Sequence, residues 1–136
     1  MKTASTTLAV LLVLFLAAGS GLKAQETSYK NVTPNSIETL KNGITSNNTG
    51  LRKSSIYMAG LYKINETVNL LTEELKNEKD PGTKILIALS LYNIGNPKGM
   101  EAVKRLAETD NDLKVRRMST ALYKTYTGSA EDISER

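Results

Sequence analysis

The chain has 136 residues and a formal net charge of +4, and it contains no cysteine, histidine or tryptophan. The lack of cysteine and histidine excludes disulfides, thiol nucleophiles, histidine-based acid–base catalysis and metal sites built on those side chains. The 18 basic and 14 acidic residues are interspersed, so the charge is too weak and too mixed to predict a nucleic-acid partner.

The N-terminal segment has the layout of a secretory signal peptide. Lys2 precedes an uncharged apolar run, Leu8–Ala18, and small residues then lead to Ala24 and Gln25. The run is too short to span a bilayer comfortably. We therefore expect residues 1–24 to be a signal peptide cleaved between Ala24 and Gln25, and the protein to be periplasmic or secreted. The alternative is that the segment is kept as a membrane anchor.

The rest of the chain suits one helical domain that folds without disulfides. Residues 25–32 are predicted to be irregular. Beyond them, residues that can cap a helix N-terminus precede apolar-periodic runs, and proline follows three of them. These residues are Thr33, Asn48, Asn65, Asp80, Asn96 and Asp110. They predict six helices over residues 33–127, with Gly128 ending the last one and residues 128–136 forming a flexible polar tail.

The predicted helices alternate between two types with a period of about 31 residues. One type repeats a Leu-Tyr pair, at Leu61-Tyr62, Leu91-Tyr92 and Leu122-Tyr123. The other repeats an apolar stripe, in which Ile37, Leu40 and Ile44 correspond to Val68, Leu71 and Leu75. Two helices per unit in three units predict a short α-solenoid.

The apolar pattern also predicts which residues are buried. The run Ile85–Tyr92 is apolar on nearly all sides, which places Leu89 in the central core. The last helix is amphipathic, with Val115, Met118 and Leu122 predicted to face inward.

The repeat resembles a known family. The segment Asp110–Arg117 (DNDLKVRR) resembles the start of the first helix of a HEAT-like repeat, and Ala88–Leu106 (ALSLYNIGNPKGMEAVKRL) is similar to the remainder. The resemblance covers residues 33–127 and implies an all-α, armadillo-like fold, a short right-handed α-solenoid of about six antiparallel helices. The units are short for this family, and the segment YKINETV lacks the turn glycine. A tetratricopeptide array is the alternative, but its units have a Trp/Gly/Pro pattern that this chain lacks.

Carboxylates are the remaining candidates for chemistry. Glu73, Glu74 and Glu78 allow an acid–base pair or an oxygen-ligand cation site, but a solvated helix face beside Lys76 is the simpler interpretation. Asp110 and Asp112 lack the glycine and the distal glutamate of a calcium loop. We predict no catalytic residue, metal or cofactor.

The repeated tyrosines Tyr62, Tyr92 and Tyr123 allow either a ladder for a peptide or sugar or a packing role at the helix ends. Each follows a leucine that is predicted to lie in the core, which favours packing.

The resemblance implies a binding surface on the helices that follow Thr33, Asn65 and Asn96. The charged residues on these helices that we select as candidates for partner binding are Lys41, Glu73, Lys76, Glu101, Lys104 and Arg105. Their mixed signs favour a protein partner, and an ordinary solvated surface is the alternative. We therefore expect an exported, non-catalytic protein-binding or scaffolding module. The alternatives are an enzyme or enzyme subunit of the HEAT-like lyase type, and a membrane-anchored structural component of an envelope complex.

Overall fold

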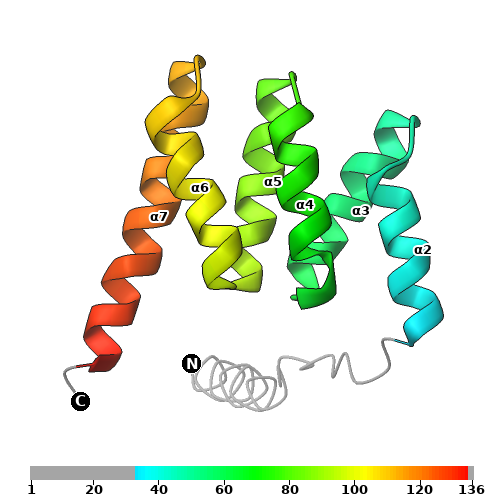
Figure 1. The fold of residues 1–136 in the computed structure, drawn as a ribbon, viewed down its shortest axis with the longest axis horizontal. Helices are drawn as coiled ribbons and strands as arrows, with labels where there is room; N and C mark the ends of the chain where they lie inside the picture. The colour runs from blue at the N-terminus through cyan, green and yellow to red at the C-terminus, as the bar shows by residue number, and fades with distance from the viewer. Residues whose placement is uncertain (1–32, 135–136) are drawn as a thin grey trace, which may run out of the picture. The chain divides into compact units, whose positions relative to one another are not determined.

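The computed structural model describes residues 33–134, and within that range it contains six α-helices, one 3₁₀ turn and no β-strand. The all-α prediction is confirmed. The elements are α2 (Pro34–Ile44), α3 (Thr49–Leu61), η1 (Asn65–Thr67), α4 (Val68–Asn77), α5 (Pro81–Ile94), α6 (Pro97–Thr109) and α7 (Leu113–Ser134) (Figure 1). The predicted signal peptide with its Ala24–Gln25 cleavage site, and the predicted irregular segment 25–32, lie outside the described residues.

Four of the predicted helix starts are confirmed. The side chains of Thr33, Asn48, Asp80 and Asn96 each accept a hydrogen bond from a backbone N–H in the first turn of α2, α3, α5 and α6. Proline occupies the start of α2, α5 and α6, where its missing N–H has no helical partner to lose.

Two predicted caps are wrong. Asn65 begins the 3₁₀ turn that precedes α4, and its Oδ1 accepts a hydrogen bond from Asn96 Nδ2 at 2.7 Å. Asp112 caps α7, because its Oδ1 accepts from the backbone N–H of Val115 at 3.0 Å. Asp110 lies two residues earlier and accepts from the backbone N–H of Asp112 at 2.8 Å. In the sequence Asp-Asn-Asp, several residues are able to cap, and the pattern alone does not distinguish them.

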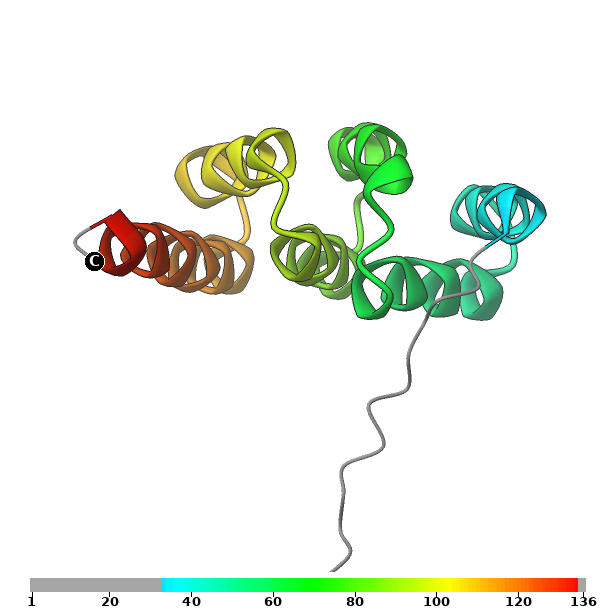
Figure 2. The ribbon, with the colours of Figure 1, turned by 90° about the horizontal axis from the view of Figure 1, so that it is seen from below.

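The helices pack in two layers (Figure 2). One layer contains α3, α5 and α7, and the other contains α2, α4 and α6. Contacts also join α2 to α3, α4 to α5 and α6 to α7. Within the layers, α5 contacts α3 and α7 extensively, whereas α4 contacts α2 and α6 more sparsely. The closely packed side of the domain is therefore the α3–α5–α7 layer.

A glycine allows α3 and α5 to approach closely. A Cβ atom at Gly60 would lie 2.6 Å from Ser90 Cα, far inside van der Waals contact. The Ser90 hydroxyl donates to the backbone carbonyl of Ile56 across the same contact, at 2.8 Å. The hydroxyl of this buried serine is therefore satisfied by the neighbouring helix.

One apolar core runs through all the described helices. Its largest fully buried side chains are Ile44, Ile56, Leu71, Ile87, Leu91, Met100, Val103 and Val115. Leu89 and Met118 were predicted to lie inside, and both predictions are wrong, since these side chains are 40% and 43% exposed. Although α5 has neighbours in both layers, one side of it still faces solvent, and Leu89 lies there.

The last helix is longer than predicted. Gly128 does not end α7, which continues to Ser134. No other group lies within 4 Å of the Cβ position of Gly128. An exposed glycine inside a helix costs only about 1 kcal/mol relative to alanine, so it does not by itself stop the helix. None of the described helices is both long enough and apolar enough to cross a membrane.

Candidate binding cleft between α4 and α6

The sparse packing between α4 and α6 leaves a cleft of about 260 Å³. Its apolar part is formed by the buried side chains of Leu75, Ala102 and Leu106. Its charged lining residues are Lys76 from α4, Lys84 from α5, Arg105 from α6, and Asp110 from the α6–α7 loop. The cleft therefore combines an apolar surface with three cations and one anion.

Lys84 and Asp110 neutralise each other. Lys84 Nζ lies 2.6 Å from Asp110 Oδ2, and their side chains are 19% and 5% exposed. Burial alone would raise the pKa of Asp110, but the Lys84 ammonium, the backbone N–H of Asp112 and the charge of Arg116 together lower it below the usual value. The carboxylate therefore stays ionised at neutral pH, and the pair adds no net charge to the cleft.

The cations left over are Lys76 and Arg105. Lys76 Nζ contacts Glu73 Oε2 at 2.9 Å, but both side chains are 60% exposed, and such a surface pair contributes little. The exposed Arg105 guanidinium has neither a hydrogen bond nor an ion pair with any described residue. An unpaired guanidinium beside an apolar surface suits a planar carboxylate, which it can bind through two parallel hydrogen bonds.

The structure does not bring the six predicted partner-binding residues together. Lys76 and Arg105 line the cleft, and Glu73 lies beside it as the partner of Lys76. Lys104 Nζ lies 5.9 Å from the centre of the Tyr123 ring, toward α7. The remaining two, Glu101 on α6 and Lys41 on α2, do not line the cleft.

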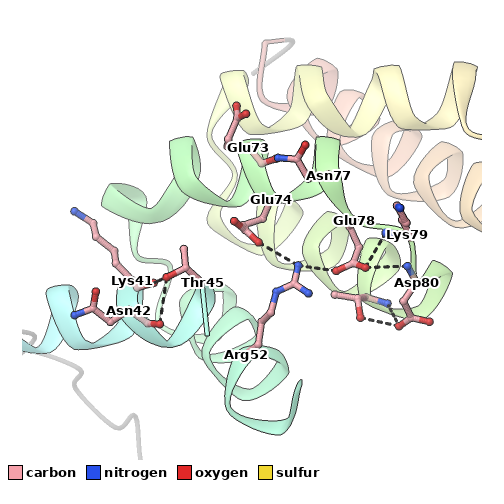
Figure 3. Close-up of polar contacts among 11 residues, drawn as sticks. Lys41, Asn42, Thr45, Arg52, Glu73, Glu74, Asn77, Glu78, Lys79 and Asp80 are labelled. Carbon is pink, nitrogen blue, oxygen red and sulfur yellow. Dashed lines mark hydrogen bonds and ion pairs between the residues drawn. The ribbon is translucent and has the colours of Figure 1, made fainter. Parts of the chain in front are cut away.

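An arginine that the sequence analysis did not select holds two of the acidic residues. Arg52 Nη2 on α3 lies 3.1 Å from Glu74 Oε2 and 2.6 Å from Glu78 Oε2 (Figure 3). Figure 3 shows Lys41 on α2 with its side chain directed away from this network. The solvated-face interpretation is therefore wrong for Glu74 and Glu78, whose side chains are 23% and 8% exposed. It holds for Glu73.

Glu78 also organises the turn between α4 and α5. Its Oε1 accepts hydrogen bonds from the backbone N–H groups of Lys79 and Asp80, both at 2.8 Å (Figure 3). Burial would raise the pKa of Glu78, but these two hydrogen bonds and the Arg52 guanidinium lower it overall. Glu74 and Glu78 therefore connect α4 and the turn that follows it to α3.

The cation that takes part in this connection stands at a repeated position in the sequence. Arg52, Lys84 and Arg116 each stand four residues after the cap of α3, α5 and α7. Lys84 pairs with an acid 26 residues later, and residues 52 and 78 are the same distance apart. Arg116 differs, because its Nη1 donates to the backbone carbonyls of Asp110 and Asn111 at 2.6 and 3.1 Å.

Tyrosines of α5 and α7 take part in packing. The half-buried rings of Tyr92, Tyr123 and Tyr126 pack against the core, and the rings of Tyr123 and Tyr126 are 6.5 Å apart at 37°. Tyr92 and Tyr126 also line a second, more open hollow with Lys63 and Asn93. These contacts agree with the packing interpretation for Tyr92 and Tyr123. The prediction of a core leucine before Tyr62 is wrong, since Leu61 is 40% exposed.

Within the described range, no three acidic side chains are grouped so that they could hold a metal ion. No protein family model matches the chain, and no curated protein or solved structure shows significant similarity to it.

Proposed function

We propose that the chain is an exported, non-catalytic protein-binding module. We further propose that its helix pairs form a short right-handed α-solenoid of antiparallel helices, of the HEAT-like kind. The two-layer packing, the contacts between successive helices and the repeated register of caps and cations support this proposal. A domain of this kind offers a surface made of equivalent helices from successive units.

The proposed binding site is the cleft between α4 and α6, and its partner is a protein segment that carries a carboxylate next to an apolar side chain. The observation that carries this proposal is the unpaired, exposed guanidinium of Arg105 at a cleft with an apolar surface. Lys76 adds a second cation there, while Lys84 is already neutralised by Asp110. A carboxylate would meet Arg105 and Lys76, and an adjacent leucine or valine would cover Leu75 and Leu106.

A peptide library displayed on phage tests this assignment with the full chain as bait. We expect selected peptides to contain Asp or Glu next to an aliphatic residue, and to lose at least about tenfold in affinity when the acid is changed to its amide. We expect the same loss in the double variant Lys76→Glu/Arg105→Glu. The matched control is Lys41→Glu/Lys104→Glu, which changes the net charge equally but leaves the cleft intact. Equal loss in both variants, or in neither, would contradict the proposed site.

The proposed export has its own test. N-terminal sequencing of the protein recovered from its native cell should give Gln25 as the first residue. A protein that begins at Met1 and sediments with membranes would support the retained anchor instead.

A further inference from the structure

The N-terminal end of the α3–α5–α7 layer exposes a side of α3 that the later helices of this layer bury. Leu51, Thr83 and Val115 occupy the same position, since the backbone N–H of each donates to the cap of its helix. Thr83 and Val115 are 2% and 0% exposed, whereas Leu51 is 53% exposed. An apolar residue is therefore exposed in α3 at a position that is buried in α5 and α7.

The same difference recurs two turns later. Met58, Ser90 and Leu122 each stand ten residues after the cap of their helix. Ser90 lies directly on α3, because its hydroxyl donates to the carbonyl of Ile56, and Leu122 is partly buried against the core. Met58 is 43% exposed. Leu51 and Met58 therefore lie on the side of α3 that corresponds to the side of α5 packed against α3.

Together, α2 and α3 form an apolar end face here. A groove of about 460 Å³ lies between the two helices. Leu40 of α2, a counterpart by register of the fully buried Leu71 of α4, lines this groove with Leu51 and Met58. Its other lining residues are uncharged and polar: Asn35, Ser36, Thr39 and Ser55. No charged side chain among the lining residues opposes the approach of an identical surface.

The opposite end of the layer is different. On α3, Ile56 and Gly60 are in contact with Ser90 of α5. The residues at the same distances from the cap on α7 are Thr120, which is half-buried, and Lys124, which is exposed. Stacking the α2–α3 end face of one molecule on α7 of another would bury the charge of Lys124, at a substantial cost in free energy. Head-to-tail stacking of successive molecules is therefore unfavourable. Two α2–α3 end faces can pack against each other, because both are apolar and have no charged lining residue.

We propose that two copies of this chain associate through their α2–α3 end faces and form a dimer with two-fold symmetry. Leu40, Leu51 and Met58 of each copy are covered by the same residues of the other. This contact differs from the one between α3 and α5 within one chain, where Ser90 of α5 lies on Ile56 and Gly60 of α3, because it joins the same side of α3 in both copies. A two-fold contact of this kind closes after two copies, so the assembly does not grow into fibres.

Light scattering coupled to size exclusion tests this dimer on the full chain. At about 100 µM we expect the mass of a dimer, and we expect Met58→Glu to raise the dimer dissociation constant at least about 100-fold, because each copy would bring a carboxylate into an apolar contact. Met118→Glu is the matched control, since Met118 lies in the same layer and is also 43% exposed. It should leave the dimer intact. Circular dichroism verifies that both variants are folded.

Cross-linking supplies a second readout that does not depend on a destabilising charge. The chain has no cysteine, so Met58→Cys introduces a unique thiol. We expect a short bifunctional maleimide to join Met58→Cys chains into covalent dimers. Met118→Cys chains should not be cross-linked and should run as single chains on a denaturing gel.

Three results would overturn the proposal. The first is a monomer at every concentration, which would mean that residues 1–32 or solvent cover the end face. The second is a dimer that survives Met58→Glu, which would place the contact elsewhere. The third is a dimer that Met118→Glu dissociates, which would place the contact at α7.

Discussion

Lys84 Nζ lies 2.6 Å from Asp110 Oδ2 and joins α5 to the loop that precedes α7. The same carboxylate accepts the backbone N–H of Asp112 through its other oxygen, and Asp112 caps α7. This one ion pair therefore fixes the start of the last helix against the middle of the layer.

We predict that Lys84→Met destabilises the protein by about 2 kcal/mol, because a nearly buried carboxylate would lose its charged hydrogen-bond partner. The control is Lys76→Met, which breaks the exposed pair with Glu73 in the same cleft and should cost less than about 0.5 kcal/mol. Urea unfolding monitored by circular dichroism gives both values. Equal costs for the two variants would show that burial of Asp110 adds nothing.

Three carboxylates with lowered pKa values should make the stability of the protein depend on pH. The Thr83 hydroxyl and backbone N–H, together with Lys53, lower the pKa of Asp80 to about 2, and the pKa values of Glu78 and Asp110 are lowered too. Their folded pKa values lie below the unfolded values of 4.5 for Glu and 3.8 for Asp. The stability they provide is therefore complete above about pH 5 and is lost as the pH falls toward about 2.

Urea midpoints measured from pH 6 to pH 2 test this dependence. We expect the midpoint to fall over that range, and we expect Asp80→Asn to fall less steeply at its acid end because one titrating group is gone. A midpoint that is constant or rises as the pH falls would contradict the assignment.

Gly60 is predicted to resist substitution. Gly60→Ala places a methyl group 2.6 Å from the Ser90 backbone, so α3 and α5 must separate, and we expect a loss of about 1–3 kcal/mol. Gly128→Ala is the matched control, because it is also a helical glycine but has open space around it. It should stabilise the protein by up to about 1 kcal/mol through helix propensity. In thermal unfolding, we expect Gly60→Ala to lower the melting temperature and Gly128→Ala to raise it.

One side of α5 faces solvent, so its leucines should contribute unequally to stability. Leu91→Ala removes a fully buried side chain and should cost about 2–5 kcal/mol. Leu89→Ala removes one that is 40% exposed and should cost about 1 kcal/mol or less. If Leu89→Ala proved as costly as Leu91→Ala in chemical denaturation, the orientation of α5 would be wrong.

The helices were predictable from sequence because their signals are local. A capping side chain such as Asn48 or Asp80 contacts its own first turn, and proline at the start of a helix acts through its own ring. The cap predicted at Asn65 was wrong because its side chain bonds to Asn96, 31 residues away. The burial predicted for Leu89 was wrong because an all-apolar run does not reveal which side lacks a neighbour.

The candidate cleft was only partly predictable. Lys76 and Arg105 were selected as charged residues on alternate helices, and they do line one cleft. Glu101 and Lys104 were selected on the same ground and do not. Which charges are neutralised depends on partners far away in the sequence, as Arg52 and its contacts with Glu74 and Glu78 show. The recurrence of a cation four residues after the cap at Arg52, Lys84 and Arg116 is the signal that would have found these partners.

The unlike ends of the helical layer give the molecule a direction that matters for protein engineering. An additional helix pair inserted ahead of Pro34 would meet Leu51 and Met58, side chains already suited to a neighbour. A pair appended behind α7 would instead have to accommodate Lys124, and Arg116 already bonds to the carbonyls of its own loop. Gene fusions and repeat insertions should therefore be tolerated with more added stability at the front of the domain than at the back.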